Sequence, residues 1–162
     1  MNNRASERRH NHQHCIDSAL ESARVLCRER GARLTPNREQ VLRLVWANHQ
    51  PVGAYSLLEA LAEQGKGRIT PPTVYRALDF LLEQGLIHRI ASLNAFIGCT
   101  DPTHRHSGYF LICQHCNTAI ELQEPPISDA ITQSADAQGF RIHQQCVEII
   151  GSCQRCQEQG DE

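Results

Sequence analysis

Cysteine and histidine are the residues of this sequence with the clearest chemistry, since its 162 residues include 8 of the first and 9 of the second. Four of the cysteines form two C-x2-C pairs, Cys113 with Cys116 and Cys153 with Cys156. The tight turn inside such a pair points both thiolates toward one metal ion, and two pairs supply the four sulfurs of a tetrahedral zinc site. One pair alone is also typical of a redox site or of chance. Two pairs in so short a chain predict a structural zinc.

A second set of ligating side chains remains once those four thiols are assigned. It consists of His88, Cys99, His104, His106 and Glu121. Taken singly, each has an ordinary alternative, such as a histidine in a strand, a buried thiol or a surface carboxylate. The set stands apart from the four thiols because it combines nitrogen, sulfur and oxygen ligands.

Apolar residues recur at helical spacing through the N-terminal half, which is therefore predicted to be helical. Gly31 and Gly85 follow the last apolar positions of two helices, while Thr35 and Thr70 each cap a helix that starts with proline. The expected helices cover about residues 16–30, 36–46, 54–64 and 71–84.

A hairpin is predicted next, because short apolar segments at 86–90 and 95–99 flank a polar turn. Several short helices followed by a hairpin favour a winged helix-turn-helix, in which N-terminal residues of the second helix of the turn contact bases in the major groove. Thr73, Tyr75 and Arg76 lie off the apolar stripe of the helix that begins at Pro71, and are the candidate DNA-binding residues. The alternative is an ordinary helical domain on which Tyr75 and Arg76 are merely exposed.

The charge distribution agrees with a nucleic-acid partner for the N-terminal half. Residues 1–90 contain 13 Lys and Arg against 9 Asp and Glu, whereas residues 91–162 contain 3 against 9. Lys66 is the only lysine, so the positive charge is carried by arginine, which suits bidentate contacts to phosphates and base edges. An unevenly charged surface with no such role is the alternative.

The last third of the chain is predicted to form a small sheet with one helix. Strand-like segments occur at 109–112, 119–122, 140–142 and 146–150, and a helical pattern covers 127–138. A sheet this small does not bury both of its faces, so we expect dimerisation, with the zinc as an internal staple.

The expected fold class is α+β, a winged helix-turn-helix DNA-binding domain followed by a small α/β dimerisation domain. We place the first domain at residues 1–98, with 1–15 as a mobile tail, a hinge at 99–107 and the dimerisation domain at 108–162. No segment is typical of a signal peptide, and no apolar run approaches the length of a membrane span. The sequence therefore predicts a cytoplasmic protein without membrane association, in which thiols stay reduced.

Several motifs of the chain occur together in a fixed order, namely Arg33–Pro36, Pro71–Leu78, the hairpin that follows and the two C-x2-C pairs. Together they resemble the ferric uptake regulator family of bacterial metal-responsive repressors, and the resemblance covers roughly residues 16–156. The run from Pro71 to Gly85, with His88 after it, resembles the zinc-sensing branch in particular.

The resemblance implies a homodimer that binds palindromic double-stranded DNA when loaded with zinc and represses zinc-uptake genes. It also implies two Zn2+ ions per subunit, no enzymatic activity and no small-molecule substrate. Tyr75 and Arg76 are then the base-contacting pair. The implied regulatory zinc ligands are His88, Cys99, His106 and Glu121, with His104 as the alternative to His106.

The ligand types agree with this implication. Two histidines, a thiolate and a carboxylate form a set that suits tetrahedral zinc, whereas an iron site more often avoids thiolate. A family sensor of iron, nickel or peroxide stays open as an alternative. So do a zinc hydrolase or deaminase that uses Glu121 as its base, and a zinc store built on the His10–Cys15 tail. His143 and Cys146 flank the place where iron- and peroxide-sensing relatives carry a histidine, so a third metal site is not expected.

Overall fold

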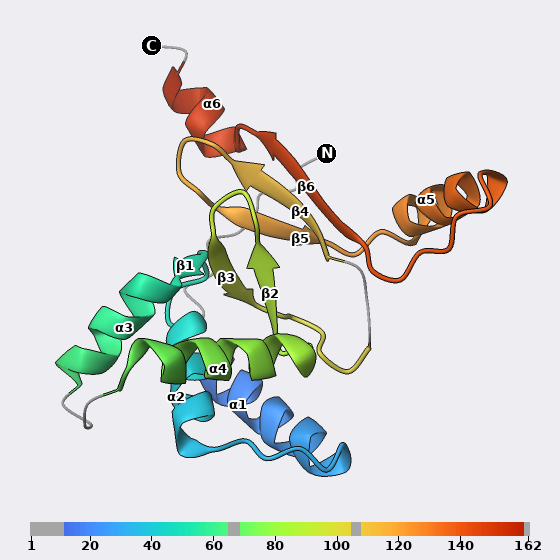
Figure 1. The fold of residues 1–162 in the computed structure, drawn as a ribbon. Helices are drawn as coiled ribbons and strands as arrows, with labels where there is room; N and C mark the ends of the chain where they lie inside the picture. The colour runs from blue at the N-terminus through green and yellow to red at the C-terminus, as the bar shows by residue number, and fades with distance from the viewer. Residues whose placement is uncertain (1–11, 65–68, 105–107, 161–162) are drawn as a thin grey trace.

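The computed structural model describes residues 12–64, 69–104 and 108–160, which form two small sheets with helices around them (Figure 1). The N-terminal domain contains α1 (His12–Glu29), α2 (Pro36–Val45), β1 (Val52–Gly53), α3 (Ala54–Glu63), α4 (Pro71–Glu83), β2 (Ile87–Ile90) and β3 (Ala95–Gly98). The C-terminal domain contains β4 (Gly108–Cys113), β5 (Ala119–Leu122), α5 (Pro125–Ala137), β6 (Cys146–Gly151) and α6 (Gln154–Gly160). The α+β class is therefore confirmed.

The predicted helix boundaries agree closely with the structure. Gly31 and Gly85 have φ values of +66° and +67°. This left-handed conformation commonly ends a helix, and glycine adopts it without the steric penalty of a Cβ atom. Thr35 is the N-cap of α2, and its hydroxyl accepts a hydrogen bond from the Arg38 N–H at 3.5 Å. Thr70 occupies the N-cap position of α4, but its hydroxyl contacts the Thr73 hydroxyl at 3.0 Å instead of capping a backbone N–H.

Two expectations about the N-terminal domain were wrong. The first helix is expected to begin near residue 16, after the tail, yet α1 begins at His12. Residues 1–11 and Gly65, the expected end of α3, lie outside the described residues. Residues 52–53 lie between two of the expected helices, where no strand is predicted, but they pair with Phe96 and Ala95 and add a third strand to the hairpin in the order β1-β3-β2.

The core of the N-terminal domain lies between the helices and the β2–β3 hairpin. The apolar stripe expected on α4 consists of Val74, Leu78, Leu81 and Leu82; the first three are buried in this core, whereas Leu82 is only partly buried. A Cβ atom on Gly98, at the end of β3, would lie 2.2 Å from Cε2 of Trp46. Glycine is therefore what allows the hairpin to approach the indole so closely.

The C-terminal sheet has the order β5-β4-β6, with β4 antiparallel to β5 and parallel to β6. The parallel pairing requires a crossover, which α5 provides. Two local predictions here need correction. Residues 140–142 form no strand, and α5 begins at Pro125, two residues before the helix expected at 127–138. The second C-x2-C pair leads into α6, a short helix that is not among the predicted elements.

The two domains meet at an apolar cluster between the hairpin and one face of the C-terminal sheet. Phe110 and Ile112 of β4 pack there with Ile90 of β2, and Leu93 and Ile97 lie at the edge. This contact is what places the hairpin residues next to the C-terminal domain. None of the helices in the described ranges has the length and apolar character needed to span a bilayer.

Candidate metal centres and nucleic-acid interface

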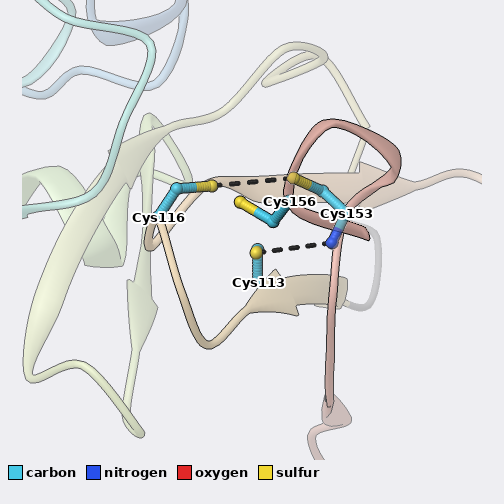
Figure 2. Close-up of side chains that lie close together, drawn as sticks. All are labelled: Cys113, Cys116, Cys153 and Cys156. Carbon is cyan, nitrogen blue, oxygen red and sulfur yellow. Dashed lines mark hydrogen bonds between the residues drawn. The ribbon is translucent and has the colours of Figure 1, made fainter. Parts of the chain in front are cut away.

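The two C-x2-C pairs converge into one four-cysteine cluster, made of Cys113, Cys116, Cys153 and Cys156 (Figure 2). One pair comes from the end of β4 and the turn after it, the other from the segment that enters α6. Their sulfur atoms lie within 4.8 Å of one another, and those of Cys116 and Cys153 are 3.7 Å apart. A tetrahedral site with Zn–S bonds of about 2.3 Å has edges of about 3.8 Å, so the cluster fits four-thiolate zinc.

Hydrogen bonds prepare part of this cluster for a cation. The Thr118 hydroxyl and N–H lower the pKa of Cys116 to about 5, and the Cys153 N–H, 3.3 Å from the sulfur of Cys113, lowers the pKa of that thiol. The pKa of Cys156 is instead raised to about 12, first by its hydrogen bond with Cys153 and then by burial. Thiolate is the ligand form of cysteine, and four thiolates at this spacing need a positive charge among them.

A second cluster, the His–Cys–Glu trio, joins the two domains. His88 lies in β2, Cys99 directly follows β3, and Glu121 lies in β5. One ligand atom from each lies within 4.8 Å of the others, and Nε2 of His88 is 3.0 Å from Oε1 of Glu121. Zinc bonds of about 2.0–2.3 Å hold ligand atoms about 3.3–3.8 Å apart, so the trio is close to coordination distance.

The side chains of the trio are largely buried. The His88 and Glu121 side chains are 16% and 8% exposed, and Cys99 is 3% exposed. Burial raises the pKa of the Cys99 thiol to about 12. The second oxygen of Glu121 accepts a hydrogen bond from the Thr100 hydroxyl at 3.1 Å, which orients the carboxylate toward His88.

His106 and His104 are the two candidates for a fourth ligand of this site. His106 lies outside the described residues. His104, the alternative, has a side chain 79% exposed, and its Nδ1 contacts the Thr103 hydroxyl at 3.0 Å and Asp101 Oδ2 at 3.2 Å. It is not grouped with the trio, which argues against the alternative. Among the described residues, His143 joins no third ligand cluster.

A cleft of about 1020 Å³ opens beside the trio, and His88, His104 and His143 contribute to its lining. Arg30 lies on its wall and donates to two carbonyls, Gln84 O at the end of α4 at 2.6 Å and Pro102 O at 3.2 Å. Arg30 thereby links the end of α4, the helix that carries the candidate DNA-binding residues, to the segment that follows Cys99.

The candidate DNA-binding residues lie in the first two turns of α4 and differ in their exposure to solvent. Tyr75 is 53% exposed and Arg76 is exposed, while Val74 and Ala77 beside them are buried. Thr73 is half-buried and bonded to Thr70, so it supports the first turn more than it presents a surface. Tyr75 and Arg76 are thus accessible side chains on a rigid helix.

Two further residues stand out that the sequence did not single out. Tyr55, in the first turn of α3, is 74% exposed, the most exposed large hydrophobic side chain among the described residues. Glu148 of β6 accepts hydrogen bonds from the Ala91 and Ser92 N–H groups of the hairpin turn at 2.6 and 3.0 Å. For Tyr55 the sequence offers only a weak signal, an aromatic residue near a glycine. For Glu148 it offers no local signal, because its partner Ala91 lies 57 positions away in the chain.

Known proteins are similar to this chain along most of its length. The model of the Ferric uptake regulator family matches residues 29–150. A zinc uptake regulation protein of Escherichia coli (strain K12) is 38% identical over 142 residues, covering 86% of this chain and 81% of that protein. A zinc uptake regulator solved in complex with zinc and DNA matches with a TM-score of 0.85 and 35% identity, over 91% of this chain and 98% of that one. The holo form of XcZur matches with a TM-score of 0.80 and 41% identity, over 88% and 99%.

Proposed function

Because the chain belongs to the ferric uptake regulator family, we propose that it is a zinc-responsive, DNA-binding repressor of zinc-uptake genes. The observation that carries the proposal is the His–Cys–Glu trio, whose three members come from the hairpin, the segment after it and the C-terminal sheet. A metal that takes ligands from both domains restrains their relative orientation. Two solved structures that match this chain over nearly their whole length are the zinc uptake regulator with zinc and DNA and the holo form of XcZur.

We propose His88, Cys99, Glu121 and His106 as the regulatory zinc ligands. A bound zinc ion would supply the positive charge that lets a buried thiolate and a carboxylate lie together. Thr100 holds the Glu121 carboxylate in place, and the apolar cluster beside His88 keeps water away. Zinc can shift the protein toward the DNA-binding form only as far as it binds that form more tightly.

The four-cysteine cluster is proposed to hold the structural zinc, which gives two zinc ions per subunit. It lies wholly within the C-terminal domain, so its metal stabilises that domain without coupling it to the hairpin. We retain residues 1–98 as the DNA-binding domain, 99–107 as the hinge and 108–162 as the dimerisation domain.

The DNA contact is assigned to α4, with Tyr75 and Arg76 at the base edges of the major groove. Arg76 suits a guanine, to which a guanidinium donates two parallel hydrogen bonds. Thr73 helps to fix the first turn of the helix. A repressor that binds chromosomal DNA acts in the cytoplasm of a bacterium, which is the location we propose.

Homodimerisation is supported by the outer face of the C-terminal sheet. Leu111, Ile120 and Ile149 are register neighbours on β4, β5 and β6, and they are 38%, 50% and 48% exposed. The α5 helix extends away from both sheets in Figure 1, and none of its side chains is buried within the described chain. A second subunit that covers these surfaces places two recognition helices on one palindrome, about 34 Å apart.

The proposed metal specificity rests on the buried thiol of the trio. Iron, nickel and peroxide sensors remain the competing reading, and a thiolate among the ligands favours zinc over them. A hydrolase or deaminase needs a zinc-bound water beside a general base. Glu121 already contacts His88 and Thr100, so we assign it a ligand role and propose no catalytic activity.

Metal content and DNA binding, measured together, test this function. The purified protein should contain one tightly held zinc per subunit, and a second zinc should be needed for tight binding to DNA selected from a random-sequence pool. Iron(II), nickel(II) and manganese(II) at matched free concentrations are the controls. DNA binding that responds to iron(II) or nickel(II) but not to zinc would refute the zinc assignment.

A further inference from the structure

The tip of the β2–β3 hairpin meets the other domain through a carboxylate that binds two of its N–H groups, beside the partly buried side chain of Leu93. Glu148 of β6 accepts the N–H groups of Ala91 and Ser92, with its two oxygens at 2.6 and 3.0 Å from the two nitrogens. These two hairpin residues are otherwise exposed. The hairpin turn itself is closed by a different bond, from Asn94 N–H to Ala91 O at 3.1 Å, so the carboxylate is not needed to form the turn.

The chemistry of this contact makes it stronger than an ordinary surface hydrogen bond. Hydrogen bonds to an ionised acceptor are about twice as strong as neutral ones, and here one carboxylate accepts two. Partial burial raises the pKa of Glu148, but hydrogen bonds from Ser92 and from the Ala91 N–H outweigh it, and the pKa lies below its usual value. Glu148 is therefore charged at neutral pH.

The position of the contact complements that of the His–Cys–Glu trio. The trio holds the base of the hairpin, where the Cys99 N–H donates to Leu86 O at 3.0 Å, whereas Glu148 holds the tip. A domain attached at one point still rotates about that point. Attachment at the base and at the tip removes this rotation, while the apolar packing of Ile90 on Phe110 fills the space between.

We propose that Glu148 is a positioning residue of the repressor: it grips the hairpin tip and, together with zinc at the hairpin base, fixes the orientation of the DNA-binding domain. This rests on the proposed zinc-dependent DNA binding. Because orientation matters only when two recognition helices must meet one palindrome, Glu148 acts on binding to a complete operator and not on the contacts within a half-site.

Three variants test whether Glu148 positions the DNA-binding domain through its contact with the hairpin tip. Glu148→Gln replaces one acceptor oxygen by an NH2 donor that faces an N–H, so it breaks the grip without changing size. Glu158→Gln makes the same change on exposed α6, where the contact with Gln154 within one helix can persist. Ser92→Pro removes one donor from the hairpin side, at the second position of a β-turn, where proline is favoured.

The measurement is zinc-saturated binding to a palindromic duplex, selected by the wild-type protein from random-sequence DNA, and to a single half-site cut from it. Glu148→Gln is expected to weaken palindrome binding about tenfold, within the range of 5- to 150-fold typical of coupling between sites. Half-site binding should stay within about twofold, and zinc content and melting temperature should match those of Glu158→Gln. Loss of a negative charge alone strengthens DNA binding, so the expected change has the opposite sign to the simple electrostatic effect.

Combination and amide exchange complete the test. Glu148→Gln with Ser92→Pro should weaken palindrome binding little more than either alone, because both break one contact. Unchanged palindrome binding in Glu148→Gln, or an equal loss on the half-site, overturns the proposal. If the wild-type protein binds no DNA with zinc, the proposed function fails instead. The grip is then judged by exchange of the Ala91 and Ser92 amide hydrogens, and equal rates in wild type and Glu148→Gln overturn it.

Discussion

Replacing Gly98 with alanine is expected to destabilise the N-terminal domain and to disturb the adjacent Cys99. The added Cβ would lie 2.2, 2.4 and 2.6 Å from three atoms of the Trp46 indole. Ordinary contact between carbon atoms is about 3.5–4.0 Å, so the hairpin or the indole must move by more than about 1 Å. Trp46 packs against the core, which leaves the end of β3 as the part that moves.

The magnitude follows from the overlap. Overpacking of this kind costs about 1–3 kcal/mol in the free energy of unfolding. In a chain of this size each kcal/mol lowers the melting temperature by about 2–4 °C, so the expected decrease is about 2–12 °C. A shift of the segment that carries Cys99 should also lower zinc affinity at the trio by about 10- to 100-fold, as is typical when the support of a metal ligand is lost.

Gly53→Ala is the matched control, because a Cβ there meets only Asn94 O, at 3.9 Å, and the backbone is extended at φ −77°. The assays are thermal unfolding followed by circular dichroism and zinc competition with a chelator of known affinity. The four-cysteine zinc should be retained in both variants. A Gly98→Ala protein whose melting temperature and zinc affinity equal those of Gly53→Ala would refute the close packing of β3 on Trp46.

Three other outcomes follow from the site geometry. Cys116→Ser should lose one zinc per subunit and the cooperative unfolding of the C-terminal domain, because the free energy of structural zinc binding is folding free energy. Metal analysis and calorimetry measure these two losses, and an unchanged melting curve would contradict the prediction. Arg76→Ala should cost about 1–3 kcal/mol of operator-binding free energy and relax selectivity at one base pair. Binding to a panel of single-substitution duplexes measures both effects, and an even loss of affinity across all duplexes would mean that Arg76 contacts a phosphate instead of a base. Burial raises the pKa of Cys99 to about 12, so the thiol is protonated at neutral pH and zinc binding at the trio must release its proton. Zinc affinity should therefore fall by about tenfold for each unit by which pH is lowered between 8 and 7, and a pH-independent affinity would contradict zinc binding through a protonated Cys99.

Local signals in the sequence were sufficient for most helix boundaries. Thr35 before Pro36, and the glycines Gly31 and Gly85, act within one turn of the chain, so their effect on the backbone does not depend on the rest of the fold. The paired cysteines were equally informative, because each C-x2-C spacing already encodes a turn, and the structure brings all four sulfurs together.

Long-range pairing was the part that local signals did not contain. The parallel register between β4 and β6 and the absence of a strand at 140–142 depend on which segments meet in space. Glu148 lies on a strand that was predicted, but nothing near it in the sequence indicates the hairpin turn as its partner.

The regulatory ligand set came from the family resemblance. Ligand chemistry then supported zinc, while spacing alone did not join His88 to Glu121 across the two domains. The structure brings these two and Cys99 within 4.8 Å of one another, which is the arrangement that the resemblance implied. Binding of zinc there, with His106 as fourth ligand, stays a prediction, as do the base contacts of Tyr75 and Arg76.

Zinc dependence of DNA binding through the His–Cys–Glu trio is best tested by a zinc titration of operator binding by Cys99→Ser. The control is Cys146→Ser, a change at an exposed cysteine outside both clusters. Cys99→Ser is expected to keep the structural zinc and the dimer, to lose the second zinc, and to lose the increase of about 5- to 150-fold in DNA affinity on adding zinc. Cys146→Ser should behave as wild type. If Cys99→Ser binds two zinc ions per subunit and retains the full zinc-stimulated affinity, the His–Cys–Glu trio is not the sensor.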